Sequence, residues 1–144
     1  MRREDLTELH YITPIANVAS ILGHGILSHR RAAGLLHQSV AKREVQERRR
    51  YVTVPGGRPL HEYVNLYICA RNPMLFLIMK QRRPEELCVL RVSPEVVDLL
   101  GVVVTDQNAA SDHVRWSSTL AIIDRNLVFA ESQVHHLRAD AQHA

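Results

Sequence analysis

Two short stretches combine side chains that suit a phosphorylated ligand. His10 lies in "LHYIT", on a predicted strand directly before a predicted helix start. An imidazole there can hydrogen-bond a ligand hydroxyl, and the first turn of a helix favours a phosphate. Arg48, Arg49 and Arg50 follow one another, and a guanidinium group holds phosphate through paired hydrogen bonds. One arginine could bind a pyrophosphate while the others meet a nucleic-acid backbone. A core or edge histidine and a solvated helix face are the plainer alternatives.

Two further stretches place polar residues where packing does not demand them. Arg71 and Asn72, followed by Pro73 and Met74, interrupt the most apolar part of the chain. Proline explains a turn there, but an arginine between apolar runs needs a partner, and a ligand at the edge of a site is one. The stretch "TDQNAAS" holds Asp106 and Asn108, which are natural loop and cap residues. Local turn chemistry is the alternative for that stretch.

Composition narrows the function classes. The chain has 144 residues with a formal net charge of +3, which fits one domain over residues 1–144. Its cationic residues are arginines apart from Lys42 and Lys80, and their excess in 30–50 suggests a polyanionic partner. No P-loop, GxGxxG, HExxH or nucleophile elbow is present, so nucleotide hydrolysis, hydride transfer and metal chemistry lack support. Without a signal sequence or a membrane-length apolar run, and with Cys69 and Cys88 in apolar surroundings, we expect a cytoplasmic protein.

The elements that position these residues are short. A strand is predicted at 9–12, followed by a helix with Thr13 as its cap, Pro14 as its first residue and Gly23 at its end. The buried face of this helix is expected to be Ile15, Val18, Ala19 and Leu22. A second helix is predicted over about 35–49.

The rest of the chain alternates strands and turns. Strands are predicted at 63–70, 87–92 and 101–105, and the segment 74–80 fits either a strand or a helical turn. Ser93 and Pro94 predict the start of a short helix. Strands and helices are interspersed without a regular βαβ rhythm, which favours an α+β fold over a doubly wound parallel sheet.

Four stretches in order resemble one family over residues 8–130. They are "LHYITPIANVASILGHGILSH", "VQERRR", "GGRPLHEYVNLYICARNPMLF" and "VVVTDQNAAS". Together they resemble the DarT toxins, NAD-dependent ADP-ribosyltransferases that modify thymine bases in single-stranded DNA. The resemblance implies the ADP-ribosyltransferase (PARP-like) fold, with two small sheets forming a split core and NAD in the cleft between them. It also implies a toxin–antitoxin system in which a macrodomain antitoxin removes the modification.

The resemblance assigns roles to particular residues. His10 and Thr13, in "HYIT", match the family's opening histidine–threonine motif on the nicotinamide ribose side, and Asn17 is included among the NAD-binding residues. The family's important arginine falls in "VQERRR" and is assigned to Arg49, as a catalytic and NAD-binding candidate, with Arg48 as the alternative. The further NAD-binding candidates are Arg48, Arg71 and Met74, and the DNA-binding candidates are Arg50, Asp106 and Asn108. No metal is implied.

The chain departs from the family at its end. The resemblance implies a late catalytic glutamate in an Ala-Glu pair that precedes an apolar strand. The one such pair here is Ala130-Glu131, and a polar run follows it. We therefore expect the chain to end before the catalytic glutamate, with Glu131 as the alternative candidate. This leaves open a family member that binds NAD or single-stranded DNA without transfer, and a transferase that acts on RNA or protein.

Overall fold

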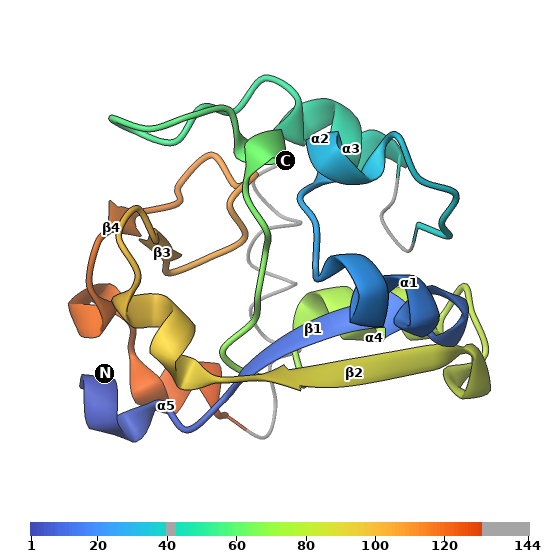
Figure 1. Ribbon diagram of the computed structural model, residues 1–144. Helices are drawn as coiled ribbons and strands as arrows, with labels where there is room; N and C mark the ends of the chain where they lie inside the picture. Colours follow the sequence, from blue (N-terminus) through green and yellow to red (C-terminus); the bar gives the residue numbers. More distant parts are fainter. Residues whose placement is uncertain (40–42, 131–144) are drawn as a thin grey trace.

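The computed structural model describes residues 1–39 and 43–130 and shows short elements around two small sheets (Figure 1). The strands are β1 (Leu9–Pro14), β2 (Leu87–Val92), β3 (Val104–Thr105) and β4 (Trp116–Ser117). The α-helices of the described residues are α1 (Val18–His24), α2 (His29–Ala32), α3 (Arg43–Arg49), α4 (Pro73–Met79) and α5 (Arg125–Val128). Short 3₁₀ turns include Ile15–Asn17, Leu60–Glu62 and Pro94–Asp98. The predicted α+β class with two small sheets is confirmed.

The strand β1 organises the molecule. It pairs antiparallel with β2, from Leu9 opposite Val92 to Pro14 opposite Leu87. On its other edge, the backbone of His10 exchanges two hydrogen bonds of 2.8 Å with that of Tyr67. The segment that follows Tyr63, green in Figure 1, runs from the region of α2 and α3 down to this ribbon. It therefore connects the helical part of the chain to the sheet.

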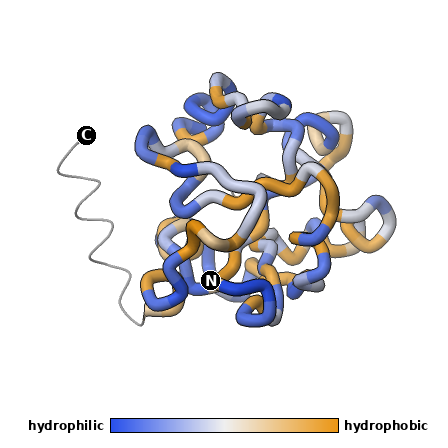
Figure 2. The backbone as a smooth tube through the Cα atoms, turned by 90° about the vertical axis from the view of Figure 1, so that its left-hand side faces the viewer, coloured by the Kyte–Doolittle hydropathy of each residue, from blue (hydrophilic) through white to orange (hydrophobic). Residues whose placement is uncertain are grey.

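The second sheet packs over a small apolar core. The strands β3 and β4 pair antiparallel. The amino group of Met1 donates to the carbonyl of Ile123 at 2.7 Å, which ties the N-terminus to this core. The buried cluster consists of Leu6, Leu9, Val104, Leu120 and Ile123. Hydrophobic and hydrophilic stretches alternate along the backbone at short intervals, as expected for many short elements (Figure 2). None of the helices in the described ranges has the length and apolar character needed to cross a membrane.

The predicted start of the first helix is wrong. Thr13 and Pro14 continue β1, and Thr13, only 1% exposed, pairs with Cys88. The α-helix begins at Val18 and ends at His24, and its C-cap is Gly25 with φ of +80° rather than Gly23. The expected apolar face is not buried either, since Ile15 and Leu22 are exposed. Pairing with β2 extended the strand past the residues whose local preference was for a helix cap.

The helix predicted over about 35–49 is confirmed for Arg43–Arg49, which form α3, and is wrong for 35–39, which form neither helix nor strand. The short helix α2 lies before the predicted start. Of this segment, 40–42 lie outside the described residues. The helix α2 is capped by Ser28, whose oxygen accepts from the backbone of Arg31 at 3.4 Å. This cap sets the start of α2, which is a separate short helix before the predicted one.

The apolar run 63–70 is not a strand, because only Tyr67 pairs with a neighbour, in a single bridge to His10. The ambiguous segment 74–80 is the helix α4, capped by Asn72. The strand at Leu87–Val92 and the turn capped by Ser93 are confirmed. The strand predicted at 101–105 is shorter and holds only Val104 and Thr105.

Candidate functional site

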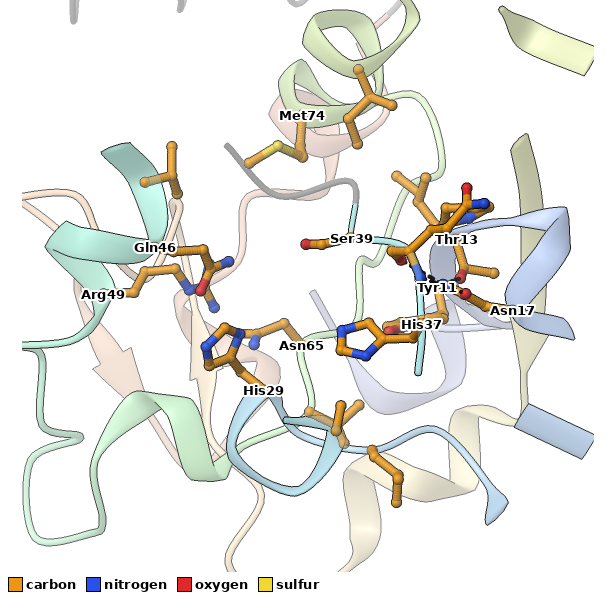
Figure 3. A pocket seen from close by; sticks show the side chains of 18 of the residues that line it. Tyr11, Thr13, Asn17, His29, His37, Ser39, Gln46, Arg49, Asn65 and Met74 are labelled. Carbon is orange, nitrogen blue, oxygen red and sulfur yellow. Dashed lines mark hydrogen bonds between the residues drawn. The ribbon is translucent and has the colours of Figure 1, made fainter. Parts of the chain in front are cut away.

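A cavity of about 170 Å³ lies between the sheet and the helices. One wall comes from β1 and the start of α1, the opposite wall from α2 and α3, and the segment 63–67 and α4 close it. Figure 3 shows Gln46, Arg49 and His29 at one end and Tyr11, Thr13 and Asn17 at the other. The lining contains no aspartate or glutamate among the described residues. A cavity with an arginine and no carboxylate is suited to an anionic ligand.

On the sheet side of the cavity, Asn17 has all its side-chain groups engaged in hydrogen bonds. The side-chain amide of Asn17 donates to the hydroxyl of Thr13 at 3.3 Å and to the carbonyl of Gln38 at 2.6 Å. Its carbonyl oxygen accepts from the backbone of Gln38 at 2.9 Å. Arg82 of the α4 side also donates to Gln38 and Ser39. Asn17, a predicted ligand residue, thus lines the cavity and also fixes the segment that crosses it.

His10 does not line this cavity. Its side chain is 9% exposed, with Nδ1 3.3 Å from the carbonyl of Tyr67 and Nε2 3.0 Å from the carboxylate of Glu8. Glu8 also forms an ion pair with Arg91, and these two partners lower the pKa of the Glu8 carboxyl. The side chain of His10 therefore connects β1 to Tyr67 and Glu8 and is not part of the cavity lining.

Tyr11 takes the place on the cavity wall that was expected for His10. It lies two residues before Thr13, so both side chains point to the same face of β1. Burial raises the pKa of the Tyr11 phenol. Sequence reasoning missed Tyr11, although the alternation of side chains along a strand places it on the same face as Thr13.

Arg49 is the charged group of the cavity. It lies in the last turn of α3, is 7% exposed, and its Nη2 is buried without a hydrogen-bond partner among the described residues. Burial lowers the pKa of its guanidinium group, and the nearby Tyr67 phenol opposes this effect. Arg48 and Arg50 are exposed and do not line the cavity. A buried cation with an unfilled hydrogen-bond donor is stabilised by an anion, so Arg49 marks where a ligand's negative charge would lie.

Two more polar atoms on this side of the molecule lack partners. Oε1 of Gln46 and Nε2 of His61 are buried without hydrogen bonds within the described part of the chain. The His61 ring stacks on that of His29, with centroids 4.2 Å apart and planes 34° apart. Burial, then His29, Arg49 and Arg50, lower the pKa of His61. Sequence reasoning missed all three side chains. Gln46 lies three residues before Arg49 on α3, a helical spacing that the sequence contained, whereas His29 and His61 meet only through the packing of α2 on the Leu60–Glu62 turn.

The break after Ala70 proves to be largely helix capping. Oδ1 of Asn72 accepts from the backbone of Leu75 at 3.0 Å, while its amide donates to the carbonyls of Cys69 and Ala70. Met74 lines the cavity. Arg71 is exposed and not part of the lining, so it is not the buried arginine that the sequence suggested.

The predicted DNA-facing loop is fixed by its own contacts. Asp106 accepts from the backbone of Arg115 at 2.8 Å and from its Nε at 2.6 Å. Burial raises the pKa of Asp106, but the hydrogen bonds from Arg115 lower it by more, so the net shift is downward. Asn108 accepts from the backbone of Ala110 at 3.0 Å. Neither residue lines the cavity, and Glu131 lies outside the described residues.

Comparison with known proteins gives consistent matches. The sequence profile of the family described as "ssDNA thymidine ADP-ribosyltransferase, DarT" matches residues 10–140. A "DNA ADP-ribosyl transferase-DNA ADP-ribosyl glycohydrolase fusion protein" of Thermosipho africanus is 37% identical over 114 residues, which are 75% of this chain and 29% of that protein. A "DNA ADP-ribosyl transferase" of Thermus sp. (strain 2.9) is 34% identical over 119 residues, which are 76% and 57% of the two chains. The chain thus spans 29% and 57% of the length of these relatives.

Solved structures agree with these matches. The chain is similar to Thermus sp. 2.9 DarT in complex with ADP-ribosylated ssDNA, with a TM-score of 0.75 and 31% identity over 89% of this chain and 67% of that chain. It is also similar to Thermus sp. 2.9 DarT in complex with NAD⁺, with a TM-score of 0.68 and 29% identity over 88% of this chain and 66% of that chain.

Proposed function

The chain belongs to the DarT family of ssDNA thymidine ADP-ribosyltransferases, and from this premise we propose that its cavity binds NAD⁺ for transfer of ADP-ribose to thymine in single-stranded DNA. The observation that carries the proposal is Arg49, a buried cation with an unfilled donor in a cavity whose described lining has no carboxylate. A pyrophosphate supplies the anion that this wall lacks. A relative solved with NAD⁺ supports the choice of ligand.

The two walls suit the two parts of this ligand. We assign the pyrophosphate to Arg49 and the ribose next to nicotinamide to the wall of Tyr11 and Thr13, with Met74 as the apolar contact. Asn17 then acts mainly by holding the segment that ends at Ser39 across the cavity. Arg48, Arg50 and Arg71 are exposed, and we assign them to the DNA backbone rather than to NAD⁺. His10 connects β1 to Tyr67 and Glu8 and is not assigned a ligand contact.

The reaction breaks the bond between the ribose and nicotinamide, which leaves as a neutral base with the bonding electrons. Positive charge develops on the ribose, and a ring nitrogen of thymine forms the new bond and gives up its proton to a base. Holding both reactants in the cavity lowers the barrier by orientation, and an unpaired base can enter where a stacked one cannot. The base is expected to be a glutamate, and Glu131, the alternative candidate, lies outside the described residues.

A second function is favoured by one observation, that no carboxylate lines the cavity among residues 1–39 and 43–130. In this second function, a chain whose cavity lacks a carboxylate binds NAD⁺ or single-stranded DNA without transferring ADP-ribose. Binding needs Arg49 and the polar walls, whereas transfer also needs a base for the thymine proton. The two functions therefore differ in product and not in affinity.

The test measures binding and transfer on the same sample. The chain is incubated with NAD⁺ and single-stranded oligonucleotides, with the matching duplexes as a control, and mass spectrometry detects an added ADP-ribose. Transfer predicts an adduct on thymine of the single strand alone. Affinity for NAD⁺ without an adduct supports the binding function, and a folded chain with neither would refute both. Arg49→Ala should weaken NAD⁺ binding by about 10- to 100-fold, whereas Arg48→Ala, on the exposed side of the same helix, should leave NAD⁺ affinity unchanged.

The family assignment also suggests the biological setting. We propose that the protein acts as the toxin of a toxin–antitoxin pair in the cytoplasm, where NAD⁺ and DNA are both present. A macrodomain antitoxin is the proposed partner, which fits a relative described as a fusion of transferase and glycohydrolase. Co-expression of a macrodomain glycohydrolase should remove the adduct from modified DNA and restore growth.

A further inference from the structure

Two histidines stack beside the arginine of the cavity and have no assigned role. His29 is the first residue of α2 and lines the cavity, at the same end as Arg49 in Figure 3. His61 lies in the Leu60–Glu62 turn behind it, half-buried, with its ring centroid 4.2 Å from that of His29. The Nε2 atom of His61 is buried and has no partner in the described chain. The stack therefore forms part of the wall that a ligand meets.

The stack is surrounded by positive charge. Arg49 at the end of α3 and Arg50 directly after it lie near His61, and Glu62 in the same turn is already paired with Arg30 and, at 4.0 Å, with Arg58. Two positively charged rings whose centroids are 4.2 Å apart repel each other, so a second positive charge on the stack is disfavoured. Burial, and then His29, Arg49 and Arg50, lower the pKa of His61, which favours the neutral form of this ring in the empty cavity.

An anion in the cavity reverses this balance. A pyrophosphate bound at Arg49 places negative charge on the same wall as His29, and negative charge favours the protonated form of an imidazole. Resting on the function proposed above, we propose that binding of the pyrophosphate draws one proton onto the His29–His61 pair. His29 then becomes a second anion-binding residue, and His61 keeps the ring in place.

The consequence is a defined dependence of affinity on pH. Because binding takes up a proton, affinity rises as pH falls from about 8 to about 6, by at most about tenfold per pH unit for one proton. Arg49 alone gives no such dependence, since its guanidinium group remains charged throughout this range. The slope therefore reports the histidine pair separately from the arginine.

The test is titration calorimetry of the full chain with ADP-ribose, which cannot be consumed by the transfer reaction. Titrations in two buffers of different ionisation enthalpy measure the protons taken up on binding. The unmodified chain should take up a substantial fraction of a proton, and its affinity should rise toward low pH. His29→Gln should abolish the uptake and lower affinity at about pH 6 toward the value at about pH 8. In His61→Gln the uptake should persist on His29, while the exposed His24→Gln serves as a control that changes neither quantity.

The outcomes separate this inference from the proposed function. Binding of ADP-ribose without proton uptake, or uptake that survives His29→Gln, would overturn the role of the pair and leave the cavity's function intact. A folded chain that does not bind ADP-ribose at all would overturn both. Melting curves of each variant confirm that the chain is folded at every pH used.

Discussion

Replacing Arg49 by methionine should make the protein more stable and should weaken its binding of ADP-ribose. Arg49 is 7% exposed and its Nη2 has no partner among the described residues, so the fold carries a buried cation with an unpaired hydrogen-bond donor. Methionine is similar in length, flexible enough to fill the same space, and carries no group that burial penalises. The substitution therefore removes a cost to folding together with the anion-binding group.

The two effects can be estimated separately. An unsatisfied buried donor costs about 1–3 kcal/mol, more when it is charged, so Arg49→Met should raise the free energy of unfolding by about that amount. For a chain of this size each kcal/mol corresponds to roughly 3 °C, which gives a melting temperature about 3–9 °C higher. A hydrogen bond between an arginine and a phosphate contributes about 1.5–3 kcal/mol, so affinity for ADP-ribose should fall about 10- to 100-fold.

The assay pairs thermal melting by circular dichroism with calorimetric titration of ADP-ribose. Arg48→Met is the matched control, because Arg48 is the exposed neighbour on the same helix. It should change stability by less than about 0.5 kcal/mol and leave affinity unchanged. If Arg49→Met instead melts well below the unmodified chain, the arginine holds the fold together, and the inference that its free donor awaits a ligand is wrong.

Four further substitutions test the site and the segments around it. The Cβ of Gly57→Ala would lie 2.5 Å from the hydroxyl oxygen of Tyr63, a cavity residue, so this change should weaken ADP-ribose binding severalfold in calorimetry. The adjacent Gly56→Ala, with φ of +68° and open space around it, should lower stability by about 1–2 kcal/mol while affinity is kept. Asn72→Ala removes the cap of α4 and should lower stability by about 1 kcal/mol without changing affinity, which contradicts a ligand role for that side chain. The pKa of Asp106 is lowered in the folded chain, so its contribution to stability is present above the unfolded pKa of about 4 and is lost as pH falls further. Between about pH 6 and about pH 3 the melting temperature of Asp106→Asn should therefore fall less than that of the unmodified chain, and equal slopes would refute the pairing.

The sequence predicted the elements whose signals are local. Leu87–Val92 is a short apolar run bounded by turn residues, and Ser93 followed by Pro94 marks a helix start whatever surrounds it. The run 63–70 has the same apolar character but lacks a partner strand, apart from the bridge at Tyr67. Pairing depends on what the fold brings alongside, and composition does not carry that information. The same limit applies to Thr13, whose capping preference was overridden by pairing with β2.

The candidate site residues show the same limit of local sequence signals. Thr13, Asn17, Arg49 and Met74 lie on the cavity, whereas His10, Arg48 and Arg71 do not. Which of three consecutive arginines is buried depends on how α3 is rotated against the rest of the fold. The sequence of the helix does not contain that information. His29 and His61 lie far apart in the sequence and meet only through packing, so no spacing rule could join them.

The two walls of the cavity differ in how many of their polar groups are already hydrogen-bonded. This difference explains how one small cavity can have a fixed shape and also bind a ligand. On the sheet side, Asn17 uses its amide and its carbonyl on Gln38 and Thr13, so this side chain has a fixed position and little left to offer a ligand. On the helical side, Gln46 and Arg49 keep buried polar atoms unpaired. A group already hydrogen-bonded gains little from a ligand, whereas an unpaired buried donor recovers its full desolvation cost on binding. Most of the binding free energy should therefore come from the helical wall, and most of the selectivity for shape from the sheet wall.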